Sequence, residues 1–316
     1  MKKFKLIFFL FIIIFGGFIV TLLYLSKTDT QFEYTFSNIF QIWGLATKNA
    51  DRVITRFIPI DSIDEKDFGI AIKEKFDQEV SKNDPDCVYL NNLAKKLSKF
   101  TKKPFNYKIY AVDYGFPNAF ALPGGVILIT RDLLKTLKTE GQLVAIILHE
   151  VGHIELSHCL DSVRFEILTK KIQAATLGEI ADFTVRFLLQ YNYSKTIESE
   201  ADEFSYQNLL QTKYDPYSLT DSFKCLKEYD VKENLSTKTT TNVIIDYFSS
   251  HPYLELRIEK FEEEAKLWWQ YNKDAKKYTG TKNLETRTTF YQKDFGETEW
   301  VKFSTKRDKN PTTPNF

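Results

Sequence analysis

The sequence predicts an α+β protein: a mainly helical domain with a small antiparallel sheet, preceded by one transmembrane helix. Three observations lead to this expectation. An apolar run near the N-terminus is long enough to cross a bilayer. Three short alternating segments lie between residues 107 and 130, and apolar residues recur at helical spacing from Arg131 almost to residue 275. The 316 residues are 43% hydrophobic, which is enough to bury a sizeable core.

The N-terminal apolar run covers residues 6–25 and is interrupted only by Gly16, Gly17 and Thr21. At about 1.5 Å per residue, a helix of this length crosses the roughly 30 Å hydrocarbon core of a lipid bilayer. No A-x-A cleavage pattern follows, so an uncleaved anchor is favoured over a removed signal peptide, which is the alternative. The lysines before the run place the N-terminus in the cytoplasm and the folded domain in the periplasm or outside.

Composition excludes several partners. The 43 Lys and Arg residues balance 42 Asp and Glu residues, so the chain lacks the basic surplus that phosphate binding requires, and we expect no nucleic-acid partner. Cys87, Cys159 and Cys225 match no C-x-x-C spacing, and their odd number argues against a disulfide framework. We expect Cys159 to be a small buried hydrophobe. The predicted parts are an anchor, a connector, a main domain and a tail: residues 1–27, 28–60, 61–277 and 278–316.

The main domain is predicted to begin with two helices. Residues 63–80 place apolar side chains at helical spacing. The second helix is predicted to start after Asp84 as N-cap, with Pro85 in the first helical position, and to end near Phe100.

Three alternating segments then predict strands over residues 107–112, 118–122 and 126–130. Pro123, Gly124 and Gly125 separate the last two strands, and Pro followed by Gly suits a type II turn, whose second central residue has a positive φ. We therefore expect a hairpin. The tail is expected to add a strand or two around residues 300–303, or to stay loose.

An H-E-x-x-H motif lies in an apolar helix predicted to begin near Gln142. His149 and His153 are four residues apart, so both imidazoles lie on one helix face and can reach one metal ion. Glu150 lies about 100° further around the helix, where a carboxylate acts as general base on a zinc-activated water. An accidental match is the alternative, but two of the four histidines of the chain fall in the motif.

Catalytic zinc needs a third protein ligand and an open position. Glu198 and Asp202 are four residues apart on a predicted helix, so one can bind zinc while the other accepts the N–H of a zinc-bound imidazole. An acidic helix alone is more often a solvated face. The upstream motif lacks a third histidine at suitable spacing, and this favours Glu198 as the ligand.

His158 follows His153 by five residues, about 140° around the helix, and no glycine precedes it to end the helix. We therefore expect His158 to cap the helix end or to form a hydrogen bond nearby rather than to bind zinc. If the chain plugs its own site at rest, His158 and residues 192–196 are the candidates.

Together these residues resemble the membrane-linked gluzincin peptidases, which include the CAAX prenyl proteases, HtpX and the BepA-like enzymes. The resemblance covers residues 61–260, and four motifs in order carry it: Asn118-Ala119-Phe120-Ala121-Leu122-Pro123-Gly124-Gly125, the H-E-x-x-H motif, Glu198-x-x-x-Asp202, and His251-Pro252 with Arg257. The single predicted anchor is closer to the periplasmic branch and to the mitochondrial inner-membrane stress protease than to the multi-spanning members, and it argues against CAAX processing.

The resemblance implies a zincin-like domain with one Zn2+ per chain, bound by His149, His153 and Glu198. Glu150 would be the catalytic base, and Asp202 would support a ligand. The implied activity is endoproteolysis of protein or peptide substrates, such as misfolded envelope proteins, in membrane protein quality control.

Three further roles follow from the resemblance, each with an alternative. The strand formed by Asn118, Ala119, Phe120 and Ala121 is expected to pair with an extended substrate, or else is a purely structural hairpin. His251 would donate a hydrogen bond to the oxyanion, or is an ordinary histidine at a helix start. Arg257 would clamp a carboxylate inside the site, or forms an ion pair on the surface. 

Two rival functions remain: a non-proteolytic chaperone or binding protein on a protease scaffold, and a tethered structural protein with an accidental motif. The intact Glu150 counts against the first of them.

Overall fold

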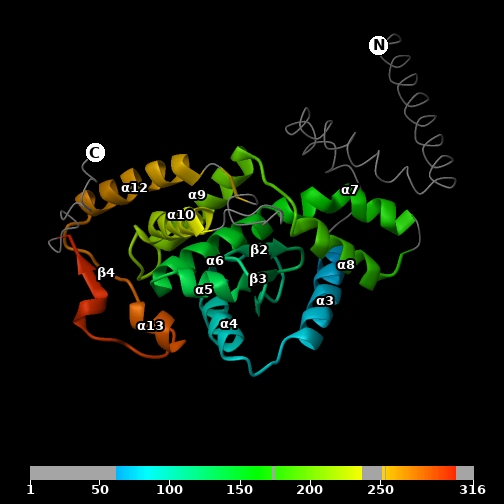
Figure 1. Ribbon diagram of the computed structural model, residues 1–316, viewed down its shortest axis with the longest axis horizontal. Helices are drawn as coiled ribbons and strands as arrows, with labels where there is room; N and C mark the ends of the chain where they lie inside the picture. Colours follow the sequence, from blue (N-terminus) through cyan, green and yellow to red (C-terminus); the bar gives the residue numbers. More distant parts are fainter. Residues whose placement is uncertain (1–61, 173–174, 237–250, 253, 304–316) are drawn as a thin grey trace, which may run out of the picture. The chain divides into compact units, whose positions relative to one another are not determined.

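The computed structural model describes residues 62–172, 175–236, 251–252 and 254–303 (Figure 1). By its internal contacts the chain divides into Met1–Phe57 and Ile58–Phe316, and the described residues all belong to the second unit. The predicted anchor at residues 6–25 lies outside them. Within the described ranges, no single helix has the length and apolar character of a membrane span, although one bent pair, Glu140–Glu155 with His158–Arg164, does by length and composition.

The first two predicted helices are confirmed as α3 (Ser62–Glu79) and α4 (Pro85–Leu97), the latter followed by a 3-10 turn at Ser98–Phe100. The Asp84 carboxylate caps α4 by accepting a hydrogen bond from the Cys87 amide at 2.9 Å. The carboxylate satisfies one of the unpaired amides of the first turn, and Pro85 has no amide to satisfy. The sequence signal for this helix start therefore acts as expected.

The three predicted strands form β1 (Lys108–Val112), β2 (Ala119–Leu122) and β3 (Val126–Thr130). Their order is β1-β3-β2, with β2 antiparallel to β3 but β1 parallel to it. The expectation of an antiparallel sheet is therefore wrong for β1. The chain passes from β1 to the far edge of the sheet and returns through the hairpin into the middle. Alternation in sequence indicates a strand but does not encode the direction of its partner.

The predicted hairpin joins β2 and β3 through Pro123, Gly124 and Gly125. Gly124 has the positive φ, 74°, expected of the second central residue of a type II turn, and Gly125 also has a positive φ, of 83°. Leu122 pairs with Val126, so three residues connect the strands. A Cβ atom at Gly124 would lie 2.4 Å from the Cα atom of Gly69. The loop therefore touches α3 backbone to backbone, and only glycine allows this approach.

Helices make up most of the chain after the sheet, as predicted. They are α5 (Arg131–Thr136), α6 (Glu140–Glu155), α7 (His158–Ile172), α8 (Leu177–Leu188), α9 (Lys195–Leu210), α10 (Ser218–Ser236) and α12 (Leu254–Tyr271). Helix α6 packs against α9, α10 and the strand β2, and Figure 1 shows it among these elements. Its residues from Leu143 to Leu148 are fully buried, so this helix forms the centre of the core.

Helix α6 ends sooner than the sequence suggested. Ser157 takes a left-handed conformation with a φ of 65°, and α7 starts at the next residue with its axis bent by 46° from that of α6. The expectation that the helix continues because no glycine is present is therefore wrong. A serine adopts the conformation that glycine usually supplies at a helix C-terminus.

The tail forms β4 (Lys276–Tyr278) and β5 (Trp300–Lys302), which pair antiparallel. The strand β5 confirms the strand expected around residues 300–303, whereas β4 and the short helix α13 (Thr281–Thr286) were not predicted. The amides of Glu140 and Gly141 donate to the carbonyls of Gly280 and Thr279 at 2.9 and 3.0 Å. The tail therefore satisfies first-turn amides of α6, the helix that carries the H-E-x-x-H motif.

Candidate metal centre

Helix α6 presents both histidines of the motif on one face. The Nε2 atoms of His149 and His153 lie 3.1 Å apart, and their rings are inclined by 82°. Both side chains are fully buried, since the apolar face of α6 packs into the core. Two imidazole nitrogens that converge at this angle point at a common position, as expected from their i, i+4 spacing.

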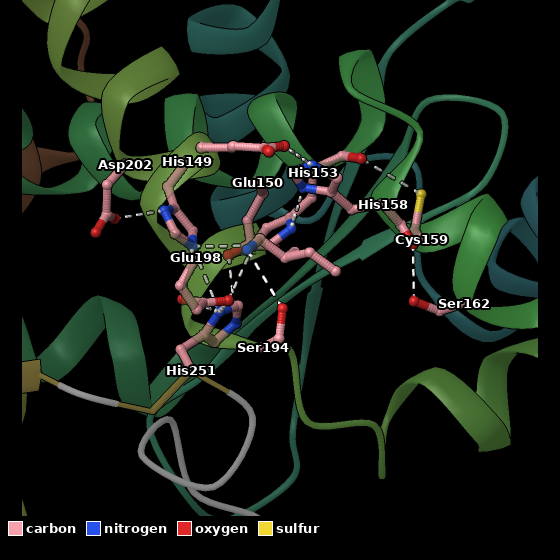
Figure 2. Close-up of polar contacts among 12 residues, drawn as sticks. His149, Glu150, His153, His158, Cys159, Ser162, Ser194, Glu198, Asp202 and His251 are labelled. Carbon is pink, nitrogen blue, oxygen red and sulfur yellow. Dashed lines mark hydrogen bonds and ion pairs between the residues drawn. The ribbon is translucent and has the colours of Figure 1, made fainter. Parts of the chain in front are cut away.

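Two further donors come from distant parts of the chain (Figure 2). Glu198 projects from the first turn of α9, with Oε1 3.4 Å from His153 Nε2 and Oε2 3.6 Å from His149 Nε2. His251 precedes α12 and places Nδ1 3.1 Å from Glu198 Oε1 and 3.4 Å from His149 Nε2. One ligand atom from each of the four side chains lies within 4.8 Å of the other three.

These distances fit a tetrahedral metal ion. Donors about 2.0–2.1 Å from an ion stand about 3.3–3.4 Å from one another in a tetrahedron, and five of the six donor separations at this site, between 3.1 and 3.6 Å, are close to that value. Three imidazole nitrogens and one carboxylate oxygen are donors that zinc commonly takes. The four residues present therefore suit a zinc ion.

Arg257 and Asp202 hold one side of this cluster. Asp202 Oδ1 lies 2.9 Å from His149 Nδ1, the ring nitrogen that faces away from the other donors. Arg257 donates to both oxygens of Asp202 at 2.7 Å, and its Nη1 lies 2.9 Å from Glu198 Oε2. The guanidinium also stacks on the ring of Phe223, 4.3 Å from its centroid. Arg257 therefore clamps carboxylates inside the site rather than pairing on the surface.

Glu150 lies beside the cluster without contributing to it. Its side chain is fully buried, and within the described part of the chain neither carboxylate oxygen has a hydrogen-bond partner. The Nε2 atom of His251 lies 3.7 Å from Oε1, within ion-pair distance if the imidazole is protonated. Burial raises the pKa of this carboxyl. A buried carboxyl without a hydrogen bond is costly, so its presence here points to a chemical role.

Comparison with known proteins agrees with this geometry. The profile of Peptidase family M48 matches residues 88–265, which is more than half of the 316-residue chain. The chain belongs to this family. The resemblance that its motifs carry is therefore confirmed.

Among its relatives, the mitochondrial metalloendopeptidase OMA1 of Schizosaccharomyces pombe is 27% identical over 187 residues, which cover 57% of this chain and 53% of that protein. The metalloprotease LoiP of Escherichia coli is 31% identical over 153 residues, which cover 45% of this chain and 59% of that protein. The protease HtpX homolog 1 of Saccharolobus solfataricus is 42% identical over 82 residues, which cover 24% of this chain and 25% of that protein. The chain thus spans little more than half the length of the first two relatives.

In this M48 protein, the side chains at the donor cluster have pKa values shifted from their ordinary values. Burial alone would raise the pKa of Glu198, but His251 and Arg257 outweigh it and hold that pKa well below its ordinary value. The pKa of Asp202 is likewise below its ordinary value, because Arg257 and His149 outweigh the effect of burial, which alone would raise it. Burial lowers the pKa values of His149 and His153, which favours the neutral imidazoles that bind metals. His149 and His153 therefore favour the neutral form and Glu198 the ionised form, as metal binding requires of these three side chains.

Two further residues lie near His153: Tyr193, from the segment 192–196 named as a candidate plug, and Glu200, to which the sequence reasoning gave no role. Tyr193 stacks on the His153 ring at 4.2 Å between centroids, and Glu200 reaches His158. Glu200 lies two residues from Glu198, on another face of α9, so the i, i+4 rule that found Asp202 passes over it. His158 itself is no metal donor: its Nδ1 lies 3.0 Å from His153 Nδ1, which agrees with the expected hydrogen bond nearby.

The predicted substrate strand is β2. Within the sheet it is an edge strand, since the order is β1-β3-β2, and it packs against α6, α7 and α8. All of its residues are buried. Asn118 donates its amide to Thr130 Oγ1 at 2.8 Å and accepts the Ala119 amide on Oδ1 at the same distance. Asn118 therefore fixes the start of the strand that holds Ala119, Phe120 and Ala121.

Proposed function

We propose that this chain is a membrane-anchored zinc metalloendopeptidase that cleaves proteins with an activated water. One observation carries the proposal: the buried carboxyl of Glu150 has no hydrogen-bond partner among the described residues and lies next to four converging donors. A purely structural site would have no use for such a group. The metal is proposed as zinc because the donor set is three imidazoles and one carboxylate.

A bound zinc ion supplies a Lewis acid that polarises a carbonyl group and makes water more acidic. Glu150 takes the proton of the attacking water and passes it to the leaving amine. Its raised pKa favours holding that proton between the two steps. Asp202 keeps His149 in the tautomer that presents Nε2 to the metal, and Arg257 holds both Asp202 and Glu198.

His251 is the donor that we expect to move. Catalytic zinc keeps one position open, whereas four protein donors converge here. The other three stand on α6 and α9, and His251 precedes α12 outside any helix. Its Nε2 atom now lies 3.7 Å from Glu150 Oε1, so a small displacement would leave it able to donate to the oxyanion, the role predicted for it. Burial alone would lower its pKa, but Glu198 and Glu150 raise it, which favours the protonated donor.

The substrate is proposed to be an extended polypeptide that adds to β2. This edge strand lies beside α6, so a segment paired with residues 119–121 would run close to the metal site. Misfolded envelope or membrane proteins are the proposed physiological class. The apolar run at residues 6–25 supports an anchored enzyme with its N-terminus in the cytoplasm and its M48 domain in the periplasm or outside.

The four-donor set also favours a second candidate, because closed sites are typical of structural zinc. In that case the chain is a non-proteolytic binding protein whose metal only stabilises it.

One experiment separates the two candidates. Full-length protein in detergent is compared as purified, after chelation, and after zinc is returned, using unfolded casein as substrate. The enzyme loses cleavage on chelation and regains it with one zinc per chain. Stoichiometric zinc without cleavage, in wild type and in His251→Ala alike, supports the structural candidate.

A further inference from the structure

His149 and His153 have different supports. Both present Nε2 to the metal site, because these two atoms lie 3.1 Å apart and each faces Glu198. The Nδ1 atom of His149 meets the Asp202 carboxylate directly. The Nδ1 atom of His153 instead meets another imidazole, with Nδ1 of His158 at 3.0 Å (Figure 2).

The positions of the protons along this second chain follow from its contacts. A His153 ring that binds a metal through Nε2 carries its proton on Nδ1, which must then donate. Nδ1 of His158 must accept that hydrogen bond, so a neutral His158 carries its own proton on Nε2. That nitrogen lies 3.1 Å from Glu200 Oε2, a carboxylate oxygen that can only accept when ionised. Each contact therefore has one donor and one acceptor.

The backbone is strained where it brings His158 to this position. On an unbroken helix His158 would point about 140° away from His153. The left-handed conformation of Ser157, with its φ of 65°, ends α6 and turns His158 back toward the site. Such a conformation is unfavourable for a residue with a Cβ atom and tends to persist where function requires it. The break thus supplies evidence for a role of His158 that is independent of the hydrogen bonds.

We propose that His158 and Glu200 are positioning residues that orient His153 and fix its tautomer as a metal ligand; the inference rests on the proposed zinc site. Helix α9 then supplies three carboxylates with separate tasks: Glu198 as ligand, Asp202 behind His149, and Glu200 behind His158. The first two are buried, whereas the Glu200 side chain is 37% exposed. The support of His153 is therefore the one that solvent can reach.

The test measures zinc affinity in full-length protein by chelator competition, together with the visible spectrum of the Co2+ form. His158→Leu removes the acceptor, and we expect zinc binding to weaken about 10–100-fold with an altered Co2+ spectrum, as for other residues that hold metal ligands. His158→Asn keeps an acceptor near the position of Nδ1, and we expect it to recover most of that affinity. Thermal unfolding of the zinc-free proteins shows whether each variant folds.

Glu200→Gln provides a second variant, since its partly exposed side chain can change without unfolding the domain. We expect a smaller loss of affinity than for His158→Leu. The matched control is Glu203→Gln on the same helix, where Glu203 is 45% exposed and pairs with Lys260 at 3.0 Å, away from the histidines. The control should bind zinc like wild type.

The outcomes are separable. Wild-type affinity and spectrum in both His158→Leu and Glu200→Gln overturn the inference but leave the zinc site intact. If His158→Leu does not fold, the zinc affinity of Glu200→Gln is compared with that of Glu203→Gln, and equal affinities overturn the inference. A wild-type protein that binds no zinc overturns the proposed function itself.

Discussion

Helix α6 carries a buried glutamate near each end, and their surroundings differ completely. Glu140, in the first turn, accepts hydrogen bonds from the hydroxyls of Tyr89 and Tyr214 at 2.9 and 2.5 Å and from the Phe290 amide at 2.9 Å. Glu150, three turns later, has no hydrogen-bond partner in the described ranges. Both side chains are fully buried.

The contrast separates a structural carboxyl from a chemical one. Around Glu140 the donors come from α4, from the segment after α9 and from the tail, so the carboxyl joins four parts of the fold. Around Glu150 no hydrogen-bond donors converge among the described residues, and His251 Nε2 lies 3.7 Å from Oε1. A buried polar group without a hydrogen-bond partner is costly, so its presence beside the donor cluster indicates a chemical role.

Glu150→Gln should give the largest effect. Loss of the general base is expected to lower kcat on casein about 10²–10⁴-fold. The variant should keep one zinc per chain and should unfold at the same or a higher temperature, because an unpaired buried carboxyl has been removed. Glu140→Gln is the matched control and should retain activity. Near-wild-type cleavage by Glu150→Gln would contradict the assignment.

Glu140→Gln tests the structural role of Glu140 through the pH dependence of stability. Burial raises the pKa of Glu140 to about 7, although its three donors oppose this. The folded state then holds this proton more tightly than the unfolded state, so stability falls as pH rises from about 4.5 to about 7. At about 1.4 kcal/mol per unit the loss is about 3 kcal/mol.

The glutamine variant lacks this titration. We expect it to match wild type in urea unfolding at pH 5, to exceed it by about 3 kcal/mol at pH 8, and to have a flatter profile between. Equal pH profiles in the two proteins would show that Glu140 is ionised throughout the range.

Zinc removal tests the other end of α6. An ion that binds only the folded state adds about 2.7 kcal/mol to stability when its free concentration is 100 times its Kd. We expect zinc to raise the unfolding temperature of chelated protein, with the same shift in Glu140→Gln, since Glu140 makes its contacts elsewhere. Magnesium, which prefers oxygen ligands, is the control. Equal shifts with both ions would contradict a nitrogen-rich zinc site.

The sequence allowed much of the site to be predicted because helical periodicity is local. The spacing of His149 and His153, and of Glu198 and Asp202, fixes which side chains share a face before any tertiary contact is known. The Asp84 cap and the hairpin glycines are local in the same sense. The helices, the cap and the positive φ of Gly124 are present as predicted, and the chemical roles of the four site residues stay predictions.

The features that were missed depend on contacts between distant segments. The parallel pairing of β1 with β3 is set by packing, not by the alternation within either strand. The break at Ser157 requires a strained serine that no local signal marks. The three hydrogen bonds to Glu140 come from residues that lie 51, 74 and 150 positions away in the sequence. A glutamate at the start of a helix therefore gave no sign of them.

Tyr89→Phe should give the smallest effect of this series. It removes one of the three donors to Glu140 and leaves the ring packing intact, so we expect a cost of about 1 kcal/mol in urea unfolding at pH 8. The cost should be smaller at pH 5, because the lost bond favoured the ionised carboxyl, and its absence raises the pKa of Glu140 further.

Tyr206→Phe is the matched control for that change. Tyr206 is 2% exposed, and its hydroxyl has no partner among the residues that the structure describes. Its removal should be neutral or stabilising at either pH, since no hydrogen bond is lost and one buried polar group disappears. If both tyrosine variants lose the same stability, the cost comes from packing and the hydroxyls at Glu140 add nothing. A loss of stability confined to Tyr89→Phe, and larger at pH 8 than at pH 5, would show that the hydrogen-bond donors around Glu140 stabilise its ionised form. The carboxyl of Glu150 has no such donors among the described residues.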